Sequence, residues 1–215
     1  HYLFLDDVMF SGGRVHRPLT EWIQSHSLTG ITVWIVVFAW HGRGQWWANK
    51  QLVDACRGRN ITIRWKHVHD FDDWRKAGEE DASLMLWPSR MPDHPDVTAW
   101  LAARPNDLKH AALRGKPTAG RLFSSPEARD VLEGAFVRVG ARWCQNSTGK
   151  MTFHPLGYNT LNGFGFGTMV TTYRNCPNNA PLALWWSDES WLPLLERRLW
   201  TQDASAFGFD AWEEE

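Results

Sequence analysis

The sequence has few cysteines, and none of them are spaced as zinc ribbons or thioredoxin-like motifs require. Only 3 occur in 215 residues, at Cys56, Cys144 and Cys176, and a sparse, odd set is typical of a reducing compartment.

Long hydrophobic runs are also lacking. The longest, from Ile31 to Trp40, is shorter than the about 20 residues that a transmembrane helix needs. No signal peptide is visible, so we expect a cytoplasmic protein with no membrane partner.

An excess of charge of one sign is lacking as well. The formal net charge is -1, which excludes a global basic field for holding nucleic acid, and we expect no nucleic-acid partner. A hydrophobic share of 43% and a charged share of 22% are ordinary for a globular domain. Tryptophan is abundant instead, with 15 residues. We interpret these as bulky core side chains rather than a platform for stacking bases.

The first third of the chain alternates between strand and helix patterns. A short apolar run precedes acids and glycines, and an apolar, β-branched run on both faces follows the first helix pattern, as in a buried central strand. Pro18 suggests that the first helix begins near it. The predicted elements are strand Tyr2–Leu5, helix Val15–Ser25, strand Ile31–Trp40, helix Gln45–Arg57 after a break at residues 41–44, and strand Asn60–His67. This order predicts an α/β fold, a parallel sheet with flanking helices.

The remainder of the chain is less regular, and we assign it to the same domain. Residues 1–67 form the predicted core, residues 68–120 an irregular insertion, and residues 121–215 a C-terminal part with a Trp-rich extension. Ser125-Pro126 is a typical helix start. The predicted elements are helix Asp96–Ala103, a helix from Ser125 to about Trp143, a polar loop Gln145–Lys150, strand Thr168–Tyr173, a turn at Asn175–Asn179, a short apolar run Leu182–Trp186 and helix Trp191–Trp200.

One stretch near the start combines the groups that a ribose phosphate requires. Asp6 and Asp7 follow an apolar strand, at the end where open α/β sheets bind ligands. Two adjacent carboxylates there are costly unless ribose hydroxyls or Mg²⁺ satisfy them. The loop Ser11-Gly12-Gly13-Arg14 brings backbone, a hydroxyl and a guanidinium to one place, in front of a helix N-terminus that favours phosphate.

This stretch, residues 2–14, resembles the PRPP-binding motif of type I phosphoribosyltransferases: four apolar residues, two acids, then a Thr/Gly loop. The resemblance implies that Asp6 and Asp7 hold the ribose hydroxyls and act as catalytic residues, with Mg²⁺ bound indirectly, through ribose or water. It implies that Phe10, Ser11, Gly12, Gly13 and Arg14 wrap the 5-phosphate. Phe10 and Arg14 depart from the pattern, since hydroxyl residues are usual at both positions. The part of such a fold that precedes the motif is expected to be missing from this sequence, which begins at His1.

A second resemblance concerns the effector domains of bacterial conflict, or anti-phage, systems that are phosphoribosyltransferase-like. It is carried by residues 3–12, by the stretch Tyr173–Asn179 and by Trp185. It implies an activity directed at PRPP or a nucleotide, and a protein partner from a defence system. Two competing interpretations stay open: a non-catalytic nucleotide-binding sensor with the same fold, and a scaffold whose pocket is vestigial, favoured by Phe10 and Arg14.

Other candidates are weaker. His41 and Arg43 follow the next strand and are expected to rim the same crevice, where they would contact substrate, or else to form a solvated turn. The cluster His67-Val68-His69-Asp70, with Asp72 and Asp73, has a metal-like composition but lacks the further histidine of metallo-hydrolases, so we interpret it as a polar strand end. The adjacent acids argue against a HAD-type phosphohydrolase, because that chemistry needs Asp-x-Asp. An acidic turn without function remains the alternative for Asp6 and Asp7.

Overall fold

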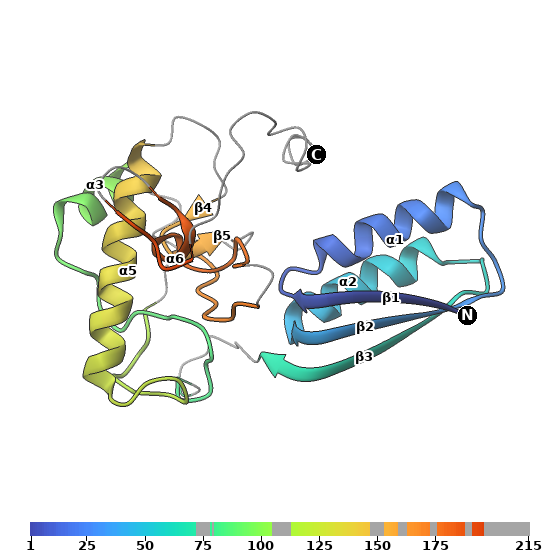
Figure 1. The fold of residues 1–215 in the computed structure, drawn as a ribbon, viewed down its shortest axis with the longest axis horizontal. Coiled ribbons are helices and arrows are strands. Elements are labelled where there is room, and N and C mark those ends of the chain that lie inside the picture. Colours follow the sequence, from blue (N-terminus) through green and yellow to red (C-terminus); the bar gives the residue numbers. More distant parts are fainter. Residues whose placement is uncertain are drawn as a thin grey trace.

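Three parallel strands carry the first half of the chain. They are β1 (Tyr2–Met9), β2 (Thr32–His41) and β3 (Thr62–Phe71), paired in the order β1-β2-β3. Helices α1 (Gly13–Ser25) and α2 (Gly42–Ala55) connect them and lie together on one face of the sheet (Figure 1). The computed structural model describes residues 1–71, 78, 80–104, 113–146, 153–158, 163–172, 176–187 and 191–195. The predicted α/β class and parallel sheet are confirmed.

The periodicity of the sequence explains why these elements pack. In β2, alternate side chains are fully buried beneath the helices: Val33, Ile35 and Val37. In α1 the buried residues recur every fourth position, at Val15, Leu19 and Ile23, which places them on one side of a helix. Residues Ala48 and Leu52 of α2 complete this core. The packing of the two hydrophobic helix faces against the sheet therefore fixes where the N-terminus of each helix lies.

The opposite face of the sheet carries no helix among the described residues (Figure 1). Leu3 and Leu5 of β1 expose 62% and 67% of their surface there. They pair in register with Trp34 and Val36 of β2, which in turn pair with Arg64 and Lys66 of β3. This face is therefore apolar over two strands and basic over the third.

Several predicted boundaries are wrong, chiefly at the carboxyl ends of β1 and β3 and at the starts of the two helices, while β3 also begins two residues later than predicted and α2 ends two residues earlier. Strand β1 runs past Leu5 to Met9, so Asp6 and Asp7 belong to it, and β3 runs past His67 to Phe71. Helix α1 begins at Gly13, and Pro18 lies inside it. Helix α2 begins at Gly42, within the predicted break. The elements gain these residues because main-chain pairing and tight packing override the local preferences of acids and glycines.

Residues 80–195 form a second unit, here called the C-terminal lobe, which lies beyond the carboxyl ends of the three strands (Figure 1). Its axis is the long helix α5 (Pro126–Asn146), which Ser125 caps by accepting the Ala128 N–H, as predicted. Its core holds Trp100, Trp143 and Trp185, which confirms the interpretation as core side chains for these three, whereas Trp46 of α2 is 62% exposed. The other elements are α3 (Pro95–Ala103), β4 (Phe153–His154), β5 (Gly157–Tyr158) and α6 (Leu182–Trp185).

Within the C-terminal lobe the strand predicted from Thr168 is wrong, since Thr168 forms only an isolated bridge with Met85. The apolar run Leu182–Trp185 is a short helix, buried at every position. The helix predicted from Trp191 is absent over residues 191–195, and its remainder lies outside the described residues. The same holds for Tyr173, Arg174 and Asn175 and for most of the predicted loop Gln145–Lys150, whose first two residues belong to α5. Within the described part of the chain, no helix is long and apolar enough to traverse a bilayer.

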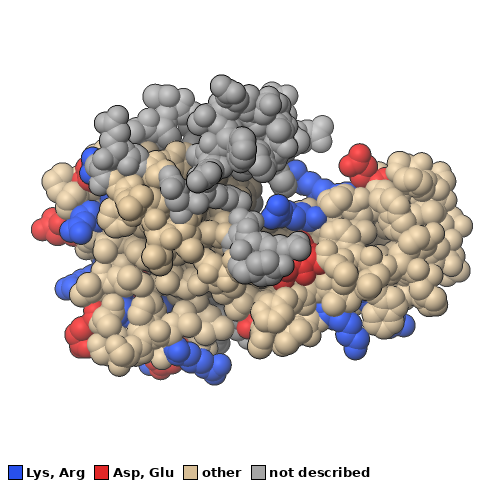
Figure 2. Space-filling model, in the orientation of Figure 1, with Lys and Arg blue, Asp and Glu red and all other residues tan. Residues whose placement is uncertain are grey.

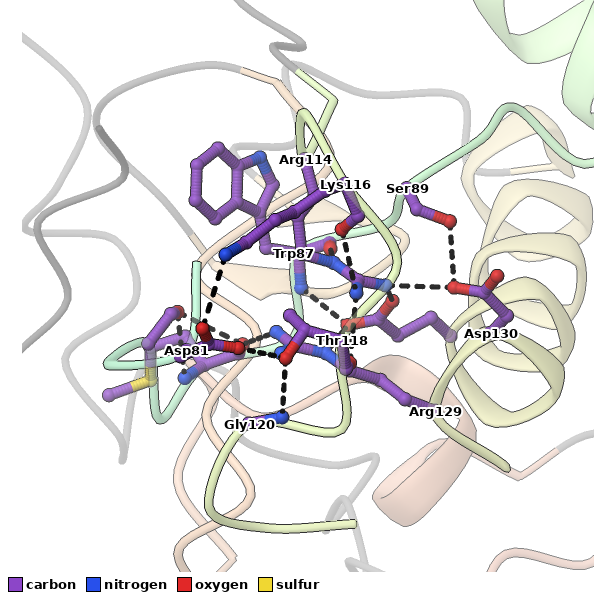
Figure 3. Close-up of polar contacts among 12 residues, drawn as sticks. Asp81, Trp87, Ser89, Arg114, Lys116, Thr118, Gly120, Arg129 and Asp130 are labelled. Carbon is purple, nitrogen blue, oxygen red and sulfur yellow. Dashed lines mark hydrogen bonds and ion pairs between the residues drawn. The ribbon is translucent and has the colours of Figure 1, made fainter. Parts of the chain in front are cut away.

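Charged side chains of both signs are scattered over the visible face of the molecule (Figure 2). Inside the C-terminal lobe, however, Arg114, Arg129 and Glu133 are buried and form ion pairs (Figure 3). The Arg114 guanidinium donates to Glu133 Oε2 at 2.9 Å, to Asp130 Oδ1 at 2.8 Å and to the Trp87 carbonyl at 2.8 Å. Glu133 Oε1 accepts from Arg129 Nε and from the Trp87 amide, both at 2.8 Å. Glu133 thus joins helix α5 to two segments that precede it.

Glu133→Gln is expected to destabilise the protein by about 3–5 kcal/mol, because it leaves two buried guanidinium groups short of countercharge at unchanged side-chain volume. The measurement is urea unfolding. Asp54→Asn is the matched control, since Asp54 pairs with Arg57 on the surface, with side-chain exposures of 49% and 81%, and should change stability by less than about 0.5 kcal/mol. Equal losses of stability in Glu133→Gln and Asp54→Asn would contradict the conclusion that Glu133 compensates buried charge.

Candidate functional site

The candidate site begins where β1 turns into α1. Gly12 adopts a left-handed conformation with φ of 82° and is the N-cap of α1, with its carbonyl accepting the His16 N–H at 3.0 Å. No side chain caps this helix. The first N–H groups of a helix have no partner within it and carry the positive end of its dipole. The loop therefore presents an uncapped helix N-terminus at the carboxyl end of the sheet.

A close approach of two glycines holds this loop in place. A Cβ added at Gly44 would lie 1.7 Å from the Phe10 carbonyl oxygen, and one added at Gly12 would lie 2.6 Å from the Gly44 carbonyl oxygen. Only glycines allow the loop after β1 to lie against the first turn of α2. The N-termini of α1 and α2 are thereby brought side by side. The role of Gly44 in this contact was not predicted from the sequence. The available signal was the Gly-x-Gly pattern that follows the second strand.

Asp6 and Asp7 lie within the last half of β1 rather than beyond it. Asp6 pairs in register with Val37, and Val8 with Ala39. Each carboxylate accepts the N–H of the following residue: Asp6 Oδ1 from Asp7 at 2.9 Å, and Asp7 Oδ1 from Val8 at 2.8 Å. The strand continues through both acids because these contacts satisfy main-chain donors without breaking the pairing with β2.

The environment of Asp6 disfavours its charged form. Burial raises the pKa of Asp6, and the neighbouring Asp7 carboxylate raises it further, while the hydrogen bond from the Asp7 amide and the Arg14 guanidinium act in the opposite direction. Among the described residues, Asp6 Oδ2 has no hydrogen-bond partner. A partly buried carboxylate with an open oxygen is poised to accept hydroxyl donors or to face a cation.

The surroundings of Phe10 explain why this residue departs from the phosphoribosyltransferase pattern. Its side chain is 5% exposed and lies in an aromatic cluster, edge-on to Phe166 of the C-terminal lobe at 5.4 Å and stacked on Phe71 at 6.2 Å between ring centroids. The ring is directed into the junction of the two lobes. Of the predicted phosphate-wrapping residues, the structure brings Ser11 to Arg14 together at the helix start, and Phe10 anchors them.

His41 and Arg43 do lie beside this loop. The His41 side chain is buried, caps α2 by accepting the Gly44 N–H at Nδ1 at 3.4 Å, and contacts Phe166 edge-on at 4.9 Å. Arg43 is exposed in the first turn of α2. His41 therefore positions the helix start, and Arg43 is the more accessible of the two.

A residue that sequence reasoning missed completes the surroundings of Asp7. Thr172 Oγ1, from the C-terminal lobe, donates to Asp7 Oδ2 at 3.1 Å, across 165 positions of sequence. No local pattern signals such a contact. At the junction of the two lobes, acidic and basic side chains lie next to one another (Figure 2).

The remaining candidates form no metal centre among the described residues, where no group of three or more His, Cys, Asp or Glu side chains has a suitable arrangement. Asp70 instead accepts hydrogen bonds from His67 Nε2 at 3.0 Å and from Trp40 Nε1. The His67 hydrogen bond is the main cause that lowers the pKa of Asp70. Asp72, Asp73 and Asn175 lie outside the described residues, and Asn179, in the predicted turn, donates to the carbonyl of Tyr158 in β5 at 3.1 Å.

Comparison with known proteins agrees with this geometry. A family model, PRTase-CE, matches residues 1–197. The chain belongs to the PRTase-CE family. It therefore contains a phosphoribosyltransferase-like domain, as the first motif predicted, and the match extends through the C-terminal lobe. Comparison with curated proteins and with solved structures gives no match.

Gly44→Ala in this PRTase-CE domain is expected to cost about 3 kcal/mol or more, because the new methyl group would overlap main-chain atoms of Phe10 and Ser11. The control is Gly134→Ala. Gly134 lies inside α5 with no atom within 4 Å of an added Cβ, so this change should stabilise by about 0.5–1 kcal/mol. Chemical denaturation of both variants tests the pair, and a tolerated Gly44→Ala would refute the close approach.

Asp6→Asn is expected to stabilise the ligand-free domain by about 0.5–1 kcal/mol at neutral pH. Since the pKa of Asp6 is raised in the folded state, the wild type loses stability as the pH rises through that pKa, and the uncharged variant does not. The advantage should vanish as the pH falls below the ordinary aspartate range. Thermal unfolding between pH 3.5 and 7 measures it, with exposed Asp93→Asn as the control. A pH-independent difference would contradict this origin.

Proposed function

We propose that this PRTase-CE domain binds PRPP or a ribonucleotide together with Mg²⁺ and acts on a ribose-5-phosphate substrate. The observation that carries the proposal is the meeting of an uncapped helix N-terminus with a partly buried acid pair at the carboxyl end of a parallel sheet. The helix N-terminus is suited to bind a phosphate, and the acid pair is suited to bind the hydroxyls of a sugar. The end of β1 and the loop after it connect the two at a fixed separation.

The phosphate half of the site is the start of α1. Its free N–H groups and dipole favour an anion, and the Ser11 hydroxyl adjoins them. Arg14, in the first turn, is exposed and close enough to Asp6 to influence its pKa. A guanidinium there supplies a bidentate contact in place of the hydroxyl residue that the pattern has. The neighbouring α2 start, with Arg43, adds a second positive end.

The sugar half of the site is the acid pair. Asp6 Oδ2 is open, and burial makes its charge costly in the absence of a ligand. Ribose hydroxyls donate hydrogen bonds to such a carboxylate and offset this cost. When positive charge develops at the ribose during loss of a leaving group, the same carboxylates favour it electrostatically. Asp6 and Asp7 therefore bind and orient the ribose, and no general base is assigned.

The two carboxylates are suited to hold Mg²⁺ indirectly, through ribose or water. Two adjacent carboxylates, with no third metal-ligating side chain among the described residues, suit an ion that keeps most of its water and is held through substrate phosphates. When bound, Mg²⁺ would neutralise phosphate charge on the ligand. The chain's own contribution is to position the Asp6 carboxylate toward the ligand, on a strand whose following loop is held by the packing of Phe10 against Phe71 and Phe166.

A non-catalytic nucleotide sensor is the second candidate, favoured by Phe10. Phe10 and Phe166 are in contact and so connect the loop after β1 to the C-terminal lobe. A ligand bound at this loop would therefore change the packing or stability of that lobe. Turnover distinguishes the two: an enzyme of the glycosyltransferase type releases base or pyrophosphate, and a sensor releases neither. The resemblance to conflict-system domains supports a role in bacterial anti-phage defence, with a protein partner from that system.

The proposal is tested by thermal shift with PRPP and Mg²⁺. Ligand at 100 times its dissociation constant stabilises by about 2.7 kcal/mol, which corresponds to roughly 5–10 °C for a chain of this size. The shift should need Mg²⁺ and vanish in the Asp6→Asn/Asp7→Asn variant, while exposed Asp93→Asn retains it. No Mg²⁺-dependent shift with PRPP or any ribonucleotide would contradict the proposal.

A further inference from the structure

We infer that Thr172 is a positioning residue: it fixes the carboxylate of Asp7, so that the C-terminal lobe completes the ribose site. The inference deepens the proposed function and rests on it. It starts from a difference between the two acids, which the sequence motif treats alike.

Asp7 is held at both oxygens, and Asp6 at only one. Asp7 Oδ1 accepts the Val8 amide at 2.8 Å, and Oδ2 accepts the Thr172 hydroxyl at 3.1 Å. Two donors on different oxygens define the plane of a carboxylate, and each oxygen keeps a lone pair for a ligand. Asp6 accepts only the Asp7 amide among the described residues. Asp7 is thus oriented before any ligand arrives.

Thr172 is itself carried by a rigid segment of the C-terminal lobe. Gly167 lies against Leu86, whose amide donates to the Gly167 carbonyl at 2.8 Å, and Thr168 is fully buried. Thr168 Oγ1 accepts the Val170 amide at 3.2 Å, and Val170 packs against the aromatic cluster of Phe10. The segment is therefore anchored in one lobe at residues 167–168 and reaches the other at Asp7.

A group that orients a ligand-binding side chain affects affinity without touching the ligand. If the hydroxyl is lost, Asp7 can rotate about its side-chain bonds, and binding must then fix it. Coupling is reciprocal, so a bound ligand should also hold residues 166–172 more firmly against β1. The C-terminal lobe thereby takes part in recognition through one hydroxyl group.

The experiment compares Thr172→Val with Thr172→Ser by calorimetric titration with PRPP and Mg²⁺. Valine keeps the shape and removes the donor, and we expect about tenfold weaker binding. Serine restores the donor, and affinity should return to within about twofold of the wild type. Thr171→Val is the matched control, since Thr171 is the exposed neighbour in the same segment, and it should bind like the wild type.

Amide exchange gives a readout that a merely structural role would not move. PRPP with Mg²⁺ should slow exchange in residues 166–172 of the wild type and of Thr172→Ser, but not of Thr172→Val. Wild-type affinity in Thr172→Val would overturn the inference. Equal losses in the valine and serine variants would also overturn it, because they would assign the effect to packing rather than to the hydroxyl.

Failure of the proposed function has a different signature. It appears as absence of binding by the wild type to PRPP or to any ribonucleotide. Ligand-free unfolding of Thr172→Val, Asp7→Ala and the double variant then decides on the contact alone. The inference requires the two changes to be non-additive by about threefold or more in the unfolding equilibrium constant. Additive changes would overturn it whatever the wild type binds.

Discussion

The site depends on the contact between the Phe10 carbonyl and Gly44. With no side chain at Gly44, the loop after β1 lies directly on the first turn of α2. This contact sets where α1 begins and directs the Phe10 ring toward the C-terminal lobe. The positions of the α1 N-terminus, Arg14 and the acid pair relative to one another follow from it, since all lie within a few residues of the loop.

Electrostatics adds a second constraint, which works against stability. The strand places two successive carboxylates in partly buried positions, and burial makes the charge of Asp6 unfavourable. In the C-terminal lobe the opposite arrangement prevails, since the buried charges of Arg114, Arg129 and Glu133 are paired. Among the described residues, the cost of a buried charge is therefore met by ion pairs in the C-terminal lobe and left partly unmet at Asp6.

Local patterns in the sequence were sufficient for the architecture and for the motif. The apolar run before Asp6, the fourfold spacing in α1 and the Ser125-Pro126 start are local signals, and each element they predicted is present. Boundaries failed where tertiary packing decides: Gly12, Gly13, Gly42 and Gly44 were taken as loop or break, yet they start helices because two backbones meet there.

The roles of Phe10 and Thr172 were beyond local patterns for the same reason. A buried phenylalanine in the loop after β1 is explained by Phe166 and Phe71, and the hydrogen bond to Asp7 Oδ2 by a threonine that lies far along the chain. Sequence periodicity carries information about neighbours within an element, and not about pairs that are distant in the chain.

The distance between Asp7 and Thr172 along the chain also has a consequence in time. At a synthesis rate of about 5–20 residues per second, the 165 positions between them correspond to roughly 8–30 s of translation. The strands and helices of the first 71 residues involve short sequence separations and can form early. Asp6 and Asp7 can therefore be in place early, and Asp7 receives the hydrogen bond from Thr172 only after residue 172 has left the ribosome, so a nascent chain carries the acid pair for many seconds without that hydrogen bond.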